Sequence, residues 1–259
     1  MMKNGFQLMI LCVMMLGCAR GAVKKELLSL MDNPGTAAGS DLMTALCGWP
    51  AGDKLRPDSM DIELGPESTG SSGQGFVRIS AGGDSFSCTG KVSFSYWHSY
   101  GGGHGYSGGN EIQLGKFKRL DAVDAAISDP PGARPIGMNE TRKGQLGEKS
   151  GRLPDGSFAD HYSINLENEN PLLRFNLEAE KGLNPRGYVY QGGKLVDVFS
   201  SRWSGTAPYD NICFLEKGRA VVLITTGKKS GSYAIRLDEP DEAARSMLKM
   251  PERYRKKAR

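Results

Sequence analysis

The chain has 259 residues, of which 39% are hydrophobic and 24% charged, and this composition is that of a globular protein. The formal net charge is +4, and the segment Asp241 to Arg259 alone carries seven basic and three acidic residues, so the rest of the chain is close to neutral. A near-neutral body argues against a nucleic-acid-binding surface, and we expect no nucleic-acid partner.

Residues 1–17 predict an export signal. Lys3 supplies a positive charge, and the following stretch Phe6 to Leu16 is apolar except for Gln7. This apolar stretch is too short to span a bilayer as a helix. The signal ends in Met15-Leu16-Gly17-Cys18, which resembles a bacterial lipobox with Met where Leu is usual. The resemblance implies that Cys18 is lipidated and that the protein contacts the membrane through this anchor only.

The export signal leaves two destinations open. If Cys18 is lipidated, Ala19-Arg20 lacks the aspartate that retains similar lipoproteins at the inner membrane, so we expect an outer-membrane lipoprotein that faces the periplasm or the surface. The alternative is an ordinary signal peptide cut after Ala19 or Ala22, which would release a soluble periplasmic or secreted protein.

Export also determines how the cysteines are interpreted. Cys47, Cys88 and Cys213 remain in an oxidising compartment, and three cysteines allow at most one internal disulfide. We expect the pair Cys47–Cys88, because both lie in the N-terminal half, and a buried thiol at Cys213 within the apolar stretch "NICFL". The chain has no C-x-x-C pair and its histidines show no ligand spacing, so we expect no metal and no cofactor.

In chain order, residues 18–40 are assigned to a tether, in which "AVKKELLSLM" is either a short helix or part of the tether. Period-two alternation in segments such as "GFVRIS" and "KVSFSYW", joined by frequent turn signals, predicts an N-terminal antiparallel β domain over residues 41–128 after one short helix ending near Cys47. Residues 129–157 are rich in Pro, Gly and charge and are assigned to a linker or long loop.

The second half predicts a β-sandwich over residues 158–238, followed by a helical basic tail over 239–259. Alternating strands recur there without intervening helices, as in "HYSINLE", "LLRFNLEA" and "GYVYQGGKLVDVF". The expected fold is therefore mostly β, with two small antiparallel β domains, the second a β-sandwich, and a short C-terminal helix.

The order "HYSINLE … LLRFNLEA … GYVYQGGKLVDVFSS … AVVLITTGKKSGSYAIRL" resembles the bacterial pre-peptidase C-terminal domain over His161 to Asp238. The family's usual acidic residue before the hairpin strand is absent, because Pro185-Arg186-Gly187 precedes Tyr188, so a calcium or ligand role tied to that acid is not carried over. The resemblance implies a β-sandwich accessory or binding module rather than a catalytic domain.

The glycine-rich stretch Ser99 to Asn110 fits two motifs. G-x-G-x-x-G would indicate a dinucleotide site, but the strand-like "NEIQLGKF" that follows is not the helix such a loop requires. G-x-S-x-G would place Ser107 on the nucleophile elbow of a hydrolase with His161 as its base, but the alternating helices and parallel strands of that fold are missing. We therefore expect no enzyme, and keep a serine hydrolase using Ser107 and His161 as the alternative.

Aromatic side chains in two predicted loops are the candidate binding residues. Exposed aromatic groups on loops suit contacts with a protein or a glycan. We therefore expect a non-catalytic binding or accessory module of the cell envelope whose partner is an unidentified envelope protein or glycan. The candidate residues are Trp97, His98, Tyr100, His104 and Tyr106 in the first loop, and Trp203 and Tyr209 in the second.

Overall fold

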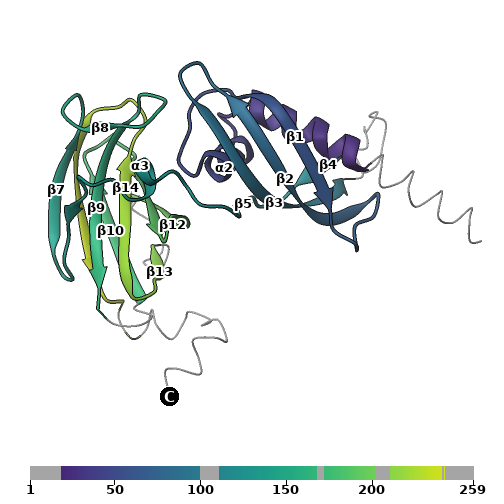
Figure 1. Ribbon diagram of the computed structural model, residues 1–259. Coiled ribbons are helices and arrows are strands. Elements are labelled where there is room, and N and C mark those ends of the chain that lie inside the picture. The colour runs from purple at the N-terminus through teal and green to yellow at the C-terminus, as the bar shows by residue number, and fades with distance from the viewer. Residues whose placement is uncertain (1–18, 100–110, 168–171, 202–210, 241, 243–259) are drawn as a thin grey trace, which may run out of the picture. The chain divides into compact units, whose positions relative to one another are not determined.

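The computed structural model describes residues 19–99, 111–167, 172–201, 211–240 and 242 (Figure 1). The chain divides into two compact units, Met1–Asp121 and Ala122–Arg259, and each is described by itself. Among the described residues no helix has both the length and the apolar character to cross a bilayer. The fold is mostly β, as the sequence predicts.

The first unit contains an antiparallel meander. Its strands pair in chain order, except that β5 joins beside β3, and alternate residues of each strand point to one buried face. The strands are β1 (Arg56–Leu64), β2 (Ser72–Gly82), β3 (Ser87–Ser99), β4 (Glu111–Leu114) and β5 (Lys118–Arg119). The buried face includes Ile62, Val77, Ile79, Val92, Phe94, Tyr96 and Ile112.

Two helices precede this sheet. Residues 19–32 are helical, and Val23, Leu27 and Met31 are buried at a spacing of four residues, which is one face of an α-helix. Helix α2 (Ala37–Cys47) begins where the Thr36 hydroxyl accepts a hydrogen bond from the Gly39 N–H and ends at Gly48, whose φ of 81° is the left-handed conformation that favours glycine. Of the two alternatives for "AVKKELLSLM", the structure has the helix, because the apolar spacing gives it a face that can be buried.

The predicted disulfide Cys47–Cys88 is confirmed and fastens the end of α2 to the beginning of β3. The two Cα atoms lie 5.0 Å apart across a sequence separation of 41. Closing a loop of that length restricts the unfolded chain and stabilises the fold by about 4 kcal/mol in the chain-entropy model. The Arg119 guanidinium donates a hydrogen bond to the Leu46 carbonyl. The C-terminal end of α2 is therefore bonded both to β3, through the disulfide, and to β5.

The second unit is a sandwich of two sheets. One sheet has the order β13-β10-β15-β7, and the other has the order β12-β11-β14-β9-β6 with β8 also paired to β9. All pairings are antiparallel except that of β6 with β9. The strands are β6 (Arg134–Pro135), β7 (Thr141–Leu146), β8 (Gly151–Arg152), β9 (Phe158–Leu166), β10 (Leu172–Ala179), β11 (Arg186–Gln191), β12 (Lys194–Ser200), β13 (Ile212–Phe214), β14 (Gly218–Thr225) and β15 (Gly231–Asp238).

A single hydrophobic core lies between the two sheets. Both sheets contribute alternate apolar side chains to it, including Phe175, Leu177, Val189, Val222 and Ile235. Cys213 belongs to this core as a free, buried thiol, as expected, and burial raises its pKa well above the ordinary value. A protonated buried thiol is chemically inert, so Cys213 acts as a packing residue.

The structure differs from the linker expected over residues 129–157. This segment contains β6, β7 and β8, and β7 pairs with β15 along six residues. The strand pattern of β7, "TRKGQL", is weak because the strand lies at a sheet edge and buries only Leu146 fully. The short helix α3 (Ala125–Ser128) precedes it, with Asp124 accepting from the Ala126 N–H at its start. Of the tail expected to be helical, residues 241 and 243–259 lie outside the described residues.

Candidate functional site

The structure places two of the residues predicted for binding. Trp97 lies on β3 with 44% of its surface exposed, on the opposite face from the buried Tyr96, and His98 follows it half-buried. A tryptophan exposed on a strand is a suitable contact surface. The other predicted site residues lie outside the described residues and stay predictions: Cys18, Tyr100, His104, Tyr106, Ser107, Trp203 and Tyr209.

His161, the base of the alternative hydrolase, is a half-buried residue of β9. Burial lowers the pKa of its ring below the ordinary value, and the backbone of Ile127 in α3 acts on this pKa in the opposite direction. Its Nε2 atom is buried and has no hydrogen-bond partner among the described residues. Within the described ranges no group of three or more His, Cys, Asp or Glu side chains could hold a metal ion.

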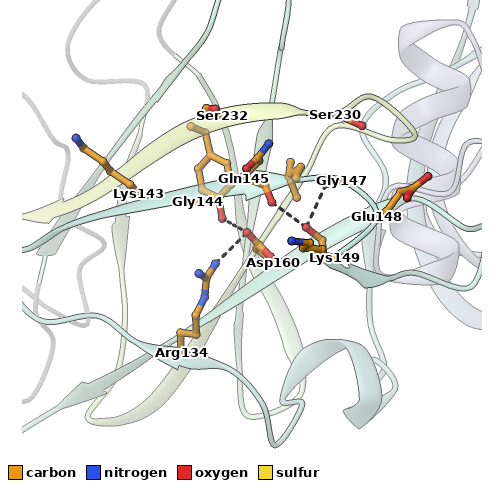
Figure 2. Close-up of a pocket in the computed structure, with 13 residues that line it drawn as sticks. Arg134, Lys143, Gly144, Gln145, Gly147, Glu148, Lys149, Asp160, Ser230 and Ser232 are labelled. Atoms are coloured by element: carbon orange, nitrogen blue, oxygen red, sulfur yellow. Dashed lines mark hydrogen bonds and ion pairs between the residues drawn. The ribbon is translucent and has the colours of Figure 1, made fainter.

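A concave pocket of about 840 Å³ lies on the second unit and is here called the β7 pocket (Figure 2). Its wall is formed by β7 from Lys143 onward and by the turn after it, and Ser230, Ser232 and Tyr233 add the beginning of β15. Arg134 of β6 and Asp160 of β9 enter from the other sheet, so the pocket lies where the two sheets open at the β7 edge.

Four side chains at this opening form one hydrogen-bonded network. Arg134 Nη2 donates to Asp160 Oδ2 at 2.9 Å and to Tyr162 Oη at 2.8 Å. The two tyrosine hydroxyl oxygens lie 2.7 Å apart, and the Tyr233 hydroxyl donates to Asp160 Oδ2 at 2.5 Å. Burial raises the pKa of both tyrosines, so both hydroxyls are protonated near neutral pH. Each can then donate one bond and accept one, and the network is satisfied.

The ring of Tyr233 reaches this network across Gly144 of β7. A Cβ atom at Gly144 would lie 2.3 Å from Tyr233 Cζ, far inside van der Waals contact, so any side chain at residue 144 would displace the ring. The rings of Tyr233 and Tyr162 meet edge to face with centroids 6.4 Å apart. Gly144 is thus the residue that lets a core tyrosine cross between the sheets.

The charges left over in the β7 pocket are mainly positive. Arg134 is paired with Asp160, and the remaining charged lining residues are the exposed Lys143, Lys149 and Glu148. The Ser150 hydroxyl closes the turn by donating to the Gln145 carbonyl at 3.0 Å and accepting from the Gly147 N–H at 3.2 Å. The pocket therefore offers ammonium groups, hydroxyls and backbone groups, which suits an anionic or polar ligand.

Sequence reasoning missed this site. Lys143 and Lys149 lie in the segment assigned to a linker, and Asp160 was not among the predicted site residues. Contacts such as Arg134–Asp160 and Tyr162–Tyr233 join residues 26 and 71 positions apart, and no local pattern encodes them. The one local signal was Gly144 within "TRKGQL", since a glycine inside a strand often marks a close approach.

Comparison with protein-family models and with curated protein sequences found no match. Among solved structures, the pre-peptidase C-terminal domain of a collagenase from Bacillus anthracis is 18% identical with a TM-score of 0.32, covering 42% of this chain and 96% of that chain. PliG, a periplasmic inhibitor of g-type lysozyme from Salmonella Typhimurium, is 12% identical with a TM-score of 0.28, covering 41% and 96%. The first is the domain that the second half of the sequence resembles.

A third structure holds CBM51-2 in complex with GlcNAc, and INT domains, from Clostridium perfringens ZmpB. It is 12% identical with a TM-score of 0.18, and the match covers 73% of this chain and 37% of that chain.

The network predicts energetic coupling between the two tyrosines. Tyr233→Phe removes a hydroxyl from a part-buried carboxylate, so the free energy of unfolding of the second unit should fall by about 1–3 kcal/mol. Tyr162→Phe breaks the same chain of hydrogen bonds. The double variant should therefore lose less unfolding free energy than the two single variants together, with a coupling energy of at least about 0.5 kcal/mol. Urea unfolding of the four proteins measures this, and strictly additive costs would contradict the network.

Proposed function

We propose that the protein is an exported, lipid-anchored module of the cell envelope that binds a protein or glycan partner without catalysing a reaction. The β7 pocket is its binding surface, and the partner presents carboxylates or other anionic groups there. The single observation that carries this proposal is the pocket itself, in which exposed Lys143 and Lys149 stand beside hydroxyl groups on a rigid sheet edge.

The arrangement of the network supports binding rather than catalysis. Asp160 accepts from Arg134 and Tyr233 through the same oxygen, and the Tyr162 hydroxyl bonds to Arg134 and Tyr233. These bonds hold the Asp160 carboxylate and both tyrosine hydroxyls in place as fixed parts of the pocket, which suits a preformed binding surface. The serine-hydrolase alternative stays a prediction, since Ser107 lies outside the described residues.

The disulfide supports export. Cys47 and Cys88 form a disulfide that ties α2 to β3, and such structural disulfides persist in oxidising compartments outside the cytoplasm. This agrees with the export signal expected over residues 1–17. An acyl chain on Cys18 would then hold the module at a membrane surface, where stable anchoring requires more than one chain.

Replacing Cys18 by Ser tests the anchor. The parent protein should fractionate with the outer membrane and should be released only by detergent, because its acyl chains insert into the bilayer. The Cys18→Ser variant should appear in the soluble fraction with its disulfide formed. A variant that stays with the membrane as the parent does would show that another feature holds the protein there.

Reversing the pocket charges tests the binding surface. Lys143→Glu together with Lys149→Glu should reduce capture of the partner from a cell-envelope extract by about tenfold, because two attractive charges become repulsive. The matched control is Lys54→Glu with Lys116→Glu, which reverses two exposed lysines of the first unit and should capture as much as the parent. Quantitative mass spectrometry of the captured material compares them, and equal losses in both variants would contradict the assignment to the β7 pocket.

A further inference from the structure

The edge strands of the sandwich are not alike. Among the described strands, β13 has three residues and β6 has two, which leaves little backbone to pair with another chain. The edge strand β12 is longer, but it points Asp197 to the same face as the core residue Val189 and its pairing shifts register beside that residue. An inward charge and an irregular register both discourage the addition of a strand.

β7 has neither an inward-pointing charge nor an irregular register, and it is six residues long. It pairs with β15 in unbroken register on one side, and no described strand pairs with its other side (Figure 1). The backbone of Thr141 to Leu146 therefore forms a regular open edge beside the β7 pocket.

The hydrogen bonds of β15 show which β7 residues direct their backbone outward. The Ser232 carbonyl accepts from Glu180 on the β10 side, and the Leu237 carbonyl accepts from Asn139 on the β7 side. Because backbone direction alternates along a strand, Tyr233 and Ile235 also face β7. Their partners Gly144 and Arg142 face back toward β15.

The intervening residues Thr141, Lys143 and Gln145 consequently direct their N–H and C=O groups away from the sheet. The Gln145 carbonyl accepts from the Ser150 hydroxyl at 3.0 Å. For the N–H of Lys143 and Gln145 and the C=O of Lys143, no hydrogen-bond partner is found within the described part of the chain. These groups have the spacing that an extended chain pairs with.

Charge selects the kind of chain. Arg142, Lys143 and Lys149 lie on or directly after β7, and the acidic residues close to them are Glu140, which is paired with Arg142 at 2.7 Å, and Glu148. A second copy of β7 would bring lysine against lysine and be repelled. An acidic strand would place its carboxylates beside Lys143 and Lys149.

We infer that β7 takes up an extended acidic segment of a protein partner as an added strand, through backbone hydrogen bonds to Lys143 and Gln145 and ion pairs to Lys143 and Lys149. The inference rests on the proposed function and narrows its partner to a protein with an acidic, extended segment.

The test uses the full mature chain and a fluorescent peptide of alternating glutamate and threonine. Gln145→Pro removes the outward N–H, and the sheet tolerates it because that N–H does not pair with β15. Gln145→Ala is the matched control, since it loses the same side chain and keeps the N–H. A peptide with alternate backbone amides methylated keeps every charge but cannot pair, and it tests the parent protein without any change to its fold.

In fluorescence anisotropy at low salt, the peptide should bind the parent saturably, and the affinity of Gln145→Ala is the reference for Gln145→Pro. Gln145→Pro and the methylated peptide should each weaken binding by about tenfold, the equivalent of one to two lost hydrogen bonds. Lys143→Gln with Lys149→Gln should weaken it by a similar factor.

Two results overturn the inference in different ways. If Gln145→Pro and the methylated peptide bind as well as their controls while the lysine variant binds weakly, strand addition is wrong and the charged pocket of the proposed function stands. If the parent does not bind the peptide saturably, or if the lysine variant binds as the parent does, both the added strand and the anionic ligand of the β7 pocket are wrong.

Discussion

The open side of the sandwich depends on the hydroxyl of Tyr233. It donates to Asp160 at 2.5 Å and lies 2.7 Å from the Tyr162 hydroxyl, so one side chain of β15 is bonded to two residues of β9 in the opposite sheet. Arg134 joins the same oxygen of Asp160, and its guanidinium also lies over the Tyr162 ring at 4.7 Å. Tyr162 and Tyr233 are buried, and their satisfied hydroxyls fix one geometry, because a buried hydroxyl left unpaired would be costly. The two sheets are therefore held at a defined separation where their apolar core ends.

The pocket and the free edge follow from this contact. Since Tyr233 must pass Gly144, β7 carries no side chain at that position, and the wall of the pocket there is bare backbone. Since Arg134 is ion-paired with Asp160, the positive charges that remain available to a partner are those of the exposed lysines. The charges of Arg134 and Asp160 thus neutralise each other, while the lysines offered to a partner are positive and lie on β7 and on the turn after it. A site held by such internal bonds keeps one conformation before its partner binds.

Sequence patterns predicted most of the scaffold and little of this site. The period-two segments of the second half gave the sandwich, and counting cysteines in an exported chain gave Cys47–Cys88 and the buried Cys213. β7 was missed because an edge strand buries few side chains, and "TRKGQL" shows neither alternation nor apolar content. For residues 19–32 the sequence left a short helix and a tether open, and the shared helical face of Val23, Leu27 and Met31 agrees with the helix. The network could not be predicted, since Arg134, Asp160 and Tyr233 meet only through the three-dimensional pairing of the sheets.

Amide hydrogen exchange along β7 tests most directly that this strand presents an open edge held in place by β15. In the unbound protein, the amides of Arg142, Gly144 and Leu146 should be protected by their bonds to β15, while those of Lys143 and Gln145 should exchange close to the rate of an unstructured chain. Residue-resolved exchange by NMR gives both sets from one experiment. Equal protection of Lys143 and Gly144 would show that the outer side of β7 is already occupied, and absence of protection throughout the strand would show that β7 is not fixed to β15.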